Sequence, residues 1–168
     1  RSLPAEANHP SVIVIDLGCA TYGDADSVRW LIDAYHPRRV YGFDPQVSLE
    51  ADGLSLEIDG VHCSFDRRAA WLHDEQVGFR MDGNRSAVDW EGDLIPCFDL
   101  AAFVLSFPEV GVLKMDVEGA EYPLLEHLVS TRADERIGKV LVEWHGSQPE
   151  REKKILETIR CPVESWVL

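Results

Sequence analysis

The chain has 168 residues, of which 45% are hydrophobic, and a formal net charge of -14. This length predicts one domain over residues 1–168, with a core at 12–168 that follows an N-terminal extension at 1–11. The acidic balance argues against a nucleic-acid partner, because phosphate contacts need a clustered basic surface. No apolar run approaches the roughly 20 residues that span a bilayer, so we expect no membrane partner.

Four cysteines, Cys19, Cys63, Cys97 and Cys161, are scattered through the chain without a C-x-x-C spacing. This pattern indicates reduced, buried thiols and a cytoplasmic protein, and it argues against a disulfide framework or a zinc site. No secretory signal peptide is visible. The sequence starts at Arg1, so we expect the natural start to lie upstream or to have been removed.

Short apolar runs predict the strands. In chain order they are VIVIDL (12–17), VYGF (40–43), GVLKMD (111–116), KVLVEW (139–144) and CPVESWVL (161–168). Continuous runs of Val, Ile and Leu at this length are typical of strands buried on both faces of a parallel sheet.

Helical patterns separate these runs. Between the first two, Val28, Leu31, Ile32 and Tyr35 form one apolar stripe at helical spacing. Between the last two, Ser147 and Glu150 have the spacing of a capping box. The helix that this box predicts carries Ile155, Leu156 and Ile159 on one face.

Alternating strands and helices predict an α/β fold with a Rossmann-like, doubly wound and mostly parallel sheet. Residues 72–95 interrupt this rhythm. Within them QVGFRM is a candidate short strand between polar, turn-rich segments, which predicts either an antiparallel excursion or a loop over the edge of the sheet.

Polar residues follow four of the predicted strands, where ligands of open parallel sheets bind. The first strand ends in Asp16-Leu-Gly18-Cys19 and leads to Gly23. The others end in Asp44-Pro45, in Asp116-Val-Glu118-Gly119 and in Glu143-Trp-His145. We expect all four ends to share one edge of the sheet.

The first two ends indicate a nucleoside cofactor. A glycine-containing turn lets backbone N–H groups approach a ligand closely, and an acid after the second strand can accept both ribose hydroxyls. The alternative is that Gly18 and Gly23 only make a tight turn and that Asp44 only caps a helix behind Pro45. The G-x-G-x-x-G and G-x-x-x-x-G-K-[ST] fingerprints are absent, which favours S-adenosylmethionine over a dinucleotide or a nucleoside triphosphate.

Four segments, DLGCATYGD, YGFDP, LKMDVEGAE and LVEWH, resemble in order and spacing the FkbM family of class I S-adenosylmethionine-dependent methyltransferases. The family pattern K-x-D-x-E-G-A-E is complete from Lys114 to Glu121, and its E-x-H is Glu143 and His145. RRAAWLHDEQVGFRM and FDLAAFV resemble two further stretches. The first motif departs from the usual D-x-G-A-N-x-G by one added residue and by Ala20 in place of Asn, and the last antiparallel strand of class I enzymes is not evident.

The candidate cofactor-binding residues that follow from the strand ends and from the resemblance are Asp16, Gly18, Cys19, Gly23, Asp44, Pro45, Ala70, Trp71 and Asp116. The resemblance implies that Ala70 and Trp71 lie beside the adenine. It also implies a small-molecule acceptor with a sugar or natural-product hydroxyl, and it leaves self-association into a homo-oligomer open.

An aliphatic hydroxyl needs a base or a metal before it attacks a methyl group. His145 or Glu143 is the expected proton acceptor, with Asp116 and Glu118 lining the transfer site. Glu121 is interpreted as a charge that offsets the positive end of a helix. Lys114 is expected to orient Asp116 by an ion pair, since the two residues share one side of the strand.

Three alternatives remain at this point. A divalent metal could be held by Asp116, Glu118, Glu143 and His145, although the sequence does not favour one. A non-catalytic or truncated Rossmann-like binding module would keep the fold without activity. A nicotinamide-dependent oxidoreductase would use the same kind of sheet, but it lacks its glycine fingerprint here.

Overall fold

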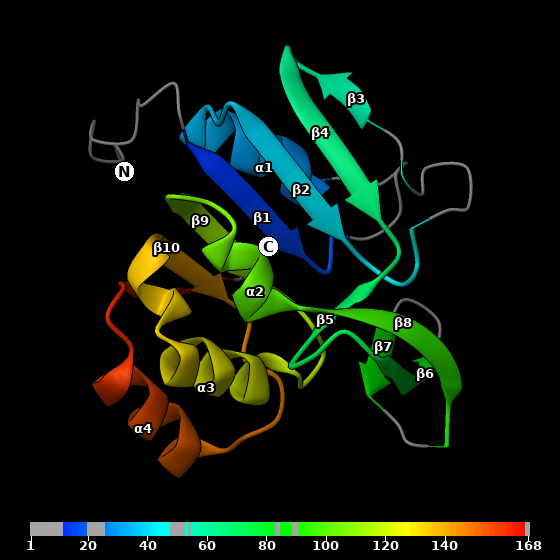
Figure 1. Cartoon of the computed structure of the whole chain (residues 1–168), viewed down its shortest axis with the longest axis vertical. Helices are drawn as coiled ribbons and strands as arrows, with labels where there is room; N and C mark the ends of the chain where they lie inside the picture. The colour runs from blue at the N-terminus through cyan, green and yellow to red at the C-terminus, as the bar shows by residue number, and fades with distance from the viewer. Residues whose placement is uncertain are drawn as a thin grey trace.

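The computed structural model describes residues 12–19, 26–47, 53, 55–82, 85–88 and 91–166. Within these ranges strands and helices alternate along the chain, as the apolar runs predict (Figure 1). The five predicted runs form β1 (Ile13–Leu17), β2 (Arg39–Phe43), β9 (Val110–Met115), β10 (Ile137–Val142) and β11 (Val163–Ser165).

The large sheet has the strand order β11-β10-β9-β1-β2-β4-β3, where β3 is Ser55–Ile58 and β4 is Val61–Asp66. All neighbouring pairs are parallel except β3 and β4. The predicted α/β class and the mostly parallel sheet are therefore confirmed. In the part of the chain that the structure describes, no antiparallel strand lies beside β11.

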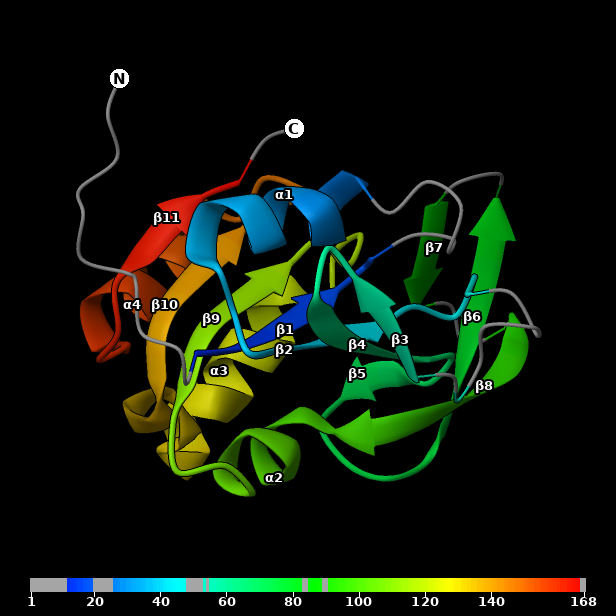
Figure 2. The ribbon, with the colours of Figure 1, turned by 90° about the horizontal axis from the view of Figure 1, so that it is seen from above.

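Helices cover both faces of this sheet (Figure 2). The face toward α1 (Asp26–Tyr35) packs Val14 and Val112 against Val28 and Leu31. On the opposite face, side chains such as Ile15 pack against α2 (Leu100–Leu105) and α3 (Glu121–Thr131). Successive strand residues thus enter different cores, which explains why the strands read as continuous apolar runs.

The helix α4 (Pro149–Thr158) exists as predicted, but its predicted cap is wrong. Gln148 is the N-cap residue, its side chain makes no capping hydrogen bond, and Pro149 occupies the first turn of the helix. Proline suits this position because the first N–H groups of a helix have no partner inside it. Ile155 is buried as expected, whereas Leu156 is 46% exposed.

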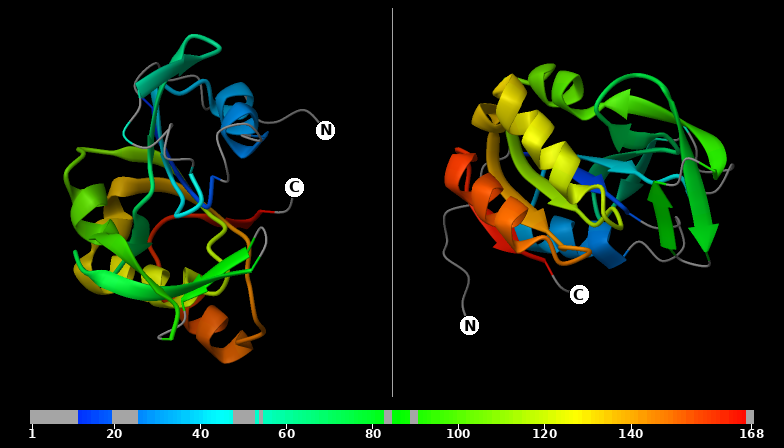
Figure 3. Two further views of the ribbon diagram at one scale, coloured as in Figure 1. Left: turned by 90° about the vertical axis from the view of Figure 1, so that its right-hand side faces the viewer. Right: turned by 90° about the horizontal axis from the view of Figure 1, so that it is seen from below.

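Residues 72–95 contribute to an antiparallel excursion, the first of the two predicted alternatives. A smaller sheet has the order β5-β8-β6-β7, formed by β5 (Ala69–Trp71), β6 (Gln76–Asp82), β7 (Arg85–Val88) and β8 (Asp93–Asp99). Figures 1 and 2 place it beyond the carboxyl ends of the parallel strands, and Figure 3 shows it from two further sides. The small sheet therefore borders the edge where a ligand is expected.

Two further expectations concern the thiols and the membrane. All four cysteines are buried and free of disulfides, as predicted. None of the described helices is long and apolar enough to cross a membrane.

Candidate functional site

The four polar strand ends lie on one edge of the large sheet, as predicted. The residue after each strand continues the hydrogen-bond ladder: Gly18 N donates to Phe43 O, Asp44 N to Asp66 O, Asp116 N to Leu17 O, and Glu143 N to Met115 O, at 2.9–3.1 Å. Because these bonds align the four residues across adjacent strands, their side chains are held by the sheet itself.

Asp16 is fully buried behind this edge. Ser27 Oγ donates to its Oδ2 at 2.8 Å, and Lys114 Nζ lies 3.1 Å from its Oδ1. Lys114 also donates to the carbonyl of Gly18 at 2.8 Å and lies 3.8 Å from Asp116. Burial would lower the pKa of Lys114, but Asp16 and then Asp116 outweigh it and raise the pKa.

The predicted ion pair between Lys114 and Asp116 is present, with 3.8 Å between Nζ and Oδ2. Lys114 also has a closer partner that was not predicted, Asp16 at 3.1 Å. The reason is strand register, because Lys114 on β9 lies directly opposite Asp16 on β1. Asp16 therefore anchors the loop after β1, and its role toward a cofactor stays a prediction.

Gly18 begins that loop in the left-handed region, with a φ of 77°. A Cβ atom at this position would lie 1.8 Å from the carbonyl oxygen of Asp116. Only glycine lets the two chain segments approach so closely. Cys19 follows and is buried on the α1 side, while the predicted Gly23 lies outside the described residues.

The other predicted cofactor residues lie at β2 and β5. Asp44 is 8% exposed, and its Oδ1 accepts a hydrogen bond of 2.7 Å from Gln46 N–H, which fixes the turn at the half-buried Pro45. Ala70 and Trp71 are buried on β5 in the small sheet. The cofactor roles of all four remain predictions.

After β9 the chain turns tightly around the carboxylate of Glu121. Glu118 and Gly119 have φ values of 50° and 102°. Glu121 is fully buried and accepts hydrogen bonds of 3.0–3.2 Å from the backbone N–H groups of Val117 and Gly119. The carboxylate thus satisfies donors that the turn and the start of α3 would leave without partners.

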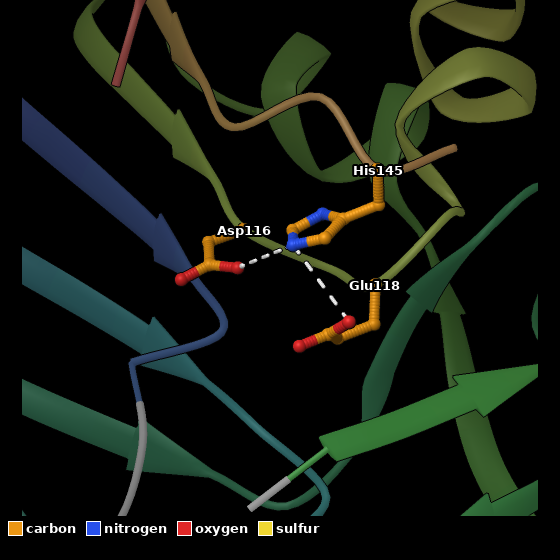
Figure 4. A group of neighbouring side chains, drawn as sticks. All are labelled: Asp116, Glu118 and His145. Carbon is orange, nitrogen blue, oxygen red and sulfur yellow. Dashed lines mark ion pairs between the residues drawn. The ribbon is translucent and has the colours of Figure 1, made fainter. Parts of the chain in front are cut away.

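The same carboxylate orients His145. Glu121 Oε1 lies 2.8 Å from His145 Nδ1, while His145 Nε2 lies 3.7–3.8 Å from oxygens of Asp116, Glu118 and Glu143. Figure 4 shows Asp116 and Glu118 pointing toward the imidazole. We call these five residues, Asp116, Glu118, Glu121, Glu143 and His145, the acidic rim.

Sequence reasoning missed the role of Glu121. Glu121 was assigned only to the positive end of a helix, but β10 ends at Val142 and the segment after it brings His145 to the Glu121 carboxylate. The available signal was the position of Glu121 at the start of α3, directly before the buried Tyr122, Leu124 and Leu125. A carboxylate that faces a core needs hydrogen-bond donors, and the DVEG turn supplies them.

A second contact fixes the segment that carries His145. Tyr122 is 1% exposed, and its hydroxyl donates to the carbonyl of Gly146 at 2.7 Å. The hydrogen bond from Glu143 N to Met115 O fixes the other side of this segment. Residues 143–146 are therefore held on both flanks of the histidine.

The electrostatics of the rim favour positive charge. Burial would lower the pKa of His145, but its hydrogen bond to Glu121 and the charges of Glu121, Glu118 and Asp116 outweigh it and raise the pKa above 6.5. One ligand atom from each of Asp116, Glu118 and His145 lies within 4.8 Å of the others. These three side chains could hold a cation.

Residues 91–161 match the family model described as "Methyltransferase FkbM domain". This segment, which is less than half of the chain, is similar to the FkbM methyltransferase family. The resemblance drawn from K-x-D-x-E-G-A-E and E-x-H is thereby confirmed, because both motifs lie inside the FkbM segment, and the match supports a methyltransferase. Neither the curated proteins nor the solved structures gave a significant match.

Proposed function

We propose that this chain is an S-adenosylmethionine-dependent methyltransferase that methylates a hydroxyl group on a small acceptor, such as a sugar or a natural product. One observation carries the proposal. The acidic rim, which lies in the FkbM segment, shares a sheet edge with Gly18 and Asp44, which precede that segment. The two halves of the predicted site thus meet.

We propose in addition that the large sheet is Rossmann-like and doubly wound. The neighbours of β1, which are β2 on one side and β9 on the other, support this assignment. Separate hydrophobic cores on the two faces support it as well. In such sheets a ligand binds at the carboxyl edge where the strand order reverses, which is where β1 and β9 meet here.

The residues at this edge fit a nucleoside cofactor by their chemistry. Asp44 stands after β2, where a carboxylate accepts hydrogen bonds from ribose hydroxyls, and Gln46 N–H holds one of its oxygens in place. The backbone of Gly18 offers a close approach, and Ala70 and Trp71 offer apolar surface for a base. When bound, S-adenosylmethionine supplies a methyl group on a positively charged sulfonium.

The acidic rim must then accept one proton. An acceptor hydroxyl loses its proton as its oxygen forms the new bond to carbon, and a group within hydrogen-bond reach has to receive it. His145 and Glu143 are the candidates, with exposed side-chain fractions of 24% and 37%. Asp116 and Glu118 lie beside them and can hold further hydroxyls of the acceptor.

The test is calorimetric titration of the chain with S-adenosylmethionine and with S-adenosylhomocysteine, in the presence of a chelator. We expect saturable binding that Asp44→Asn weakens by at least about tenfold, equivalent to about 1.4 kcal/mol. Asp33→Asn is the matched control, because Asp33 is an exposed carboxylate on α1. It should bind like the parent chain.

Two outcomes would contradict the proposal. A folded chain that binds neither ligand is not a methyltransferase of this kind. If Asp33→Asn weakens binding as much as Asp44→Asn does, the assignment of Asp44 to the ribose is wrong.

A further inference from the structure

The acidic rim concentrates negative charge around one imidazole. Four carboxylates, from Asp116, Glu118, Glu121 and Glu143, have oxygens within 2.8–3.8 Å of a ring nitrogen of His145. Lys114 lies 3.8 Å from Asp116, but it is shared with the buried Asp16 at 3.1 Å. The excess of carboxylates over basic partners among these residues favours a cation at the rim.

The tautomer of His145 adds an independent argument. Glu121 is fully buried, and its carboxylate already accepts backbone N–H bonds at the start of α3, so it can only accept from His145. Nδ1 therefore carries the proton. In the neutral imidazole this leaves a lone pair on Nε2, which lies 3.7–3.8 Å from oxygens of Asp116, Glu118 and Glu143.

Among the described residues, Nε2 makes no hydrogen bond, and carboxylate oxygens of Asp116, Glu118 and Glu143 lie 3.7–3.8 Å from it. A lone pair and carboxylates that lie this close repel each other unless a proton or a metal ion lies between them. A histidine whose other nitrogen donates to a carboxylate is the usual arrangement of a metal-ligating histidine. The geometry is thus that of a ligand with its supporting group in place.

The separations fit a shared ion. Two ligand atoms that each lie about 2.1 Å from one cation are about 3.0–4.2 Å apart, depending on the angle between them. His145 Nε2 lies 3.8 Å from Asp116 Oδ1 and 3.7 Å from Glu118 Oε2. The third separation within this group does not exceed 4.8 Å, which a small rotation of either carboxylate would reduce.

We propose that Asp116, Glu118 and His145 bind one divalent cation of the Mn²⁺ or Mg²⁺ class, with Glu121 as the group that positions His145 (Figure 4). Carboxylate-rich ligand sets prefer these harder cations, and one imidazole is compatible with Mn²⁺. Glu143 lies outside this three-residue group.

The catalytic part of this inference rests on the proposed function. The cation makes a coordinated acceptor hydroxyl more acidic. The hydroxyl oxygen forms the new bond to the methyl carbon, the carbon–sulfur bond breaks with its electrons on sulfur, and the proton passes to the carboxylate of Glu143. The cation thus settles which of the two candidate groups accepts the proton, because His145 is occupied as a ligand.

The experiment is titration of the whole chain with Mn²⁺, without cofactor, followed by electron paramagnetic resonance of the free ion. We expect one saturable site that Asp116→Asn and His145→Gln each weaken by more than about tenfold. Glu121→Gln should weaken it by about 10–100-fold, as is usual for a group that supports a ligand. Competition with Mg²⁺ identifies the hard-cation class.

Matched controls come from α3, the helix that carries Glu121. Glu126→Gln removes a carboxylate of α3 that is bonded to Arg151, and His127→Gln removes a histidine of α3 that is bonded to Asp99. Both variants should bind Mn²⁺ like the parent chain. Glu143→Gln should also retain the ion, because it removes the proton acceptor and not a ligand.

Other outcomes would overturn the inference. Absence of saturable Mn²⁺ binding to a folded chain would show that the rim holds no ion, and equal binding by the ligand variants and the parent would place the ion elsewhere. Loss of the ion in Glu143→Gln would make Glu143 a ligand and exclude it as the proton acceptor. Cofactor binding, measured separately with chelator present, distinguishes each of these from failure of the proposed function.

Discussion

Gly18 sets how closely the loop after β1 approaches the end of β9. Its positive φ and its position against the carbonyl of Asp116 both exclude other residues. Gly60, in the turn between β3 and β4, has nearly the same φ, 79° against 77°, but a Cβ there would meet nothing within 4 Å. The two glycines therefore separate backbone strain from steric contact.

We expect Gly60→Ala to lower the free energy of unfolding by about 1–2 kcal/mol, the cost of a left-handed conformation for a residue with a Cβ. Gly18→Ala should cost about 1–3 kcal/mol more, because neighbouring backbone has to move. Urea unfolding of both variants measures the difference. Equal losses would mean that the contact with Asp116 relaxes without cost.

At the same scale, the sequence predicted which residues gather at the edge and the pair of Lys114 with Asp116, but not the closer partners of Lys114 and His145. The motifs place Lys114, Asp116 and His145 correctly at strand ends. The partners of Lys114 and His145 depend on the register between β1 and β9 and on the residue at which β10 ends. A single sequence carries neither, because register is set by contacts between distant segments.

At the scale of elements, α2 and α4 begin in different ways. Asp99 caps α2, since its Oδ1 accepts from Ala102 N–H at 3.0 Å, and the same oxygen bonds His127 on α3. Ser147, the predicted cap of α4, is not the N-cap residue of that helix. Replacing Asp99 should therefore remove a helix cap, whereas replacing Ser147 should remove none.

We expect Asp99→Ala to lower the free energy of unfolding by about 1–2 kcal/mol, the typical cost of a lost N-cap. Ser147→Ala should change it by less than about 0.5 kcal/mol. Thermal or urea unfolding of the two variants provides the comparison. A larger loss of unfolding free energy for Ser147→Ala would mean that Ser147 caps α4 after all.

The strands were easier to predict than the caps for a physical reason. A strand buried on both faces needs apolar residues at every position, and this is visible in any window of the sequence. The start of α4 offered two competing signals, a capping box at Ser147 and a proline at position 149, and proline at the first turn prevailed. The small sheet was harder still, because β6, β7 and β8 mix polar with apolar residues and lack the continuous apolar runs of the parallel strands.

At the scale of the whole molecule, the two sheets contact each other through aromatic side chains. The ring centroid of Phe98, on β8 of the small sheet, lies 4.3 Å from the ring centroid of Phe43, on β2 of the large sheet. One hydrophobic cluster contains residues of both sheets, including Trp71 and Leu113. The single domain predicted from length therefore has a direct test.

Phe98→Ala should lower the free energy of unfolding by about 3–5 kcal/mol, because it empties part of this shared core. Leu94→Ala, on the same strand but 67% exposed, should change it by less than about 0.5 kcal/mol. Far-ultraviolet circular dichroism and tryptophan fluorescence should report one coincident transition for both variants. Separate transitions would show that the sheets unfold independently.

The hydroxyl of Tyr122 has a consequence for the thermodynamics of ligand capture. Together with the ladder bond at Glu143, it holds both flanks of His145 through folding alone. Side-chain and loop ordering normally subtracts from binding free energy. Here that entropy is lost before any ligand arrives, so the acidic rim can bind a small, weakly held partner without a further penalty for ordering its own backbone.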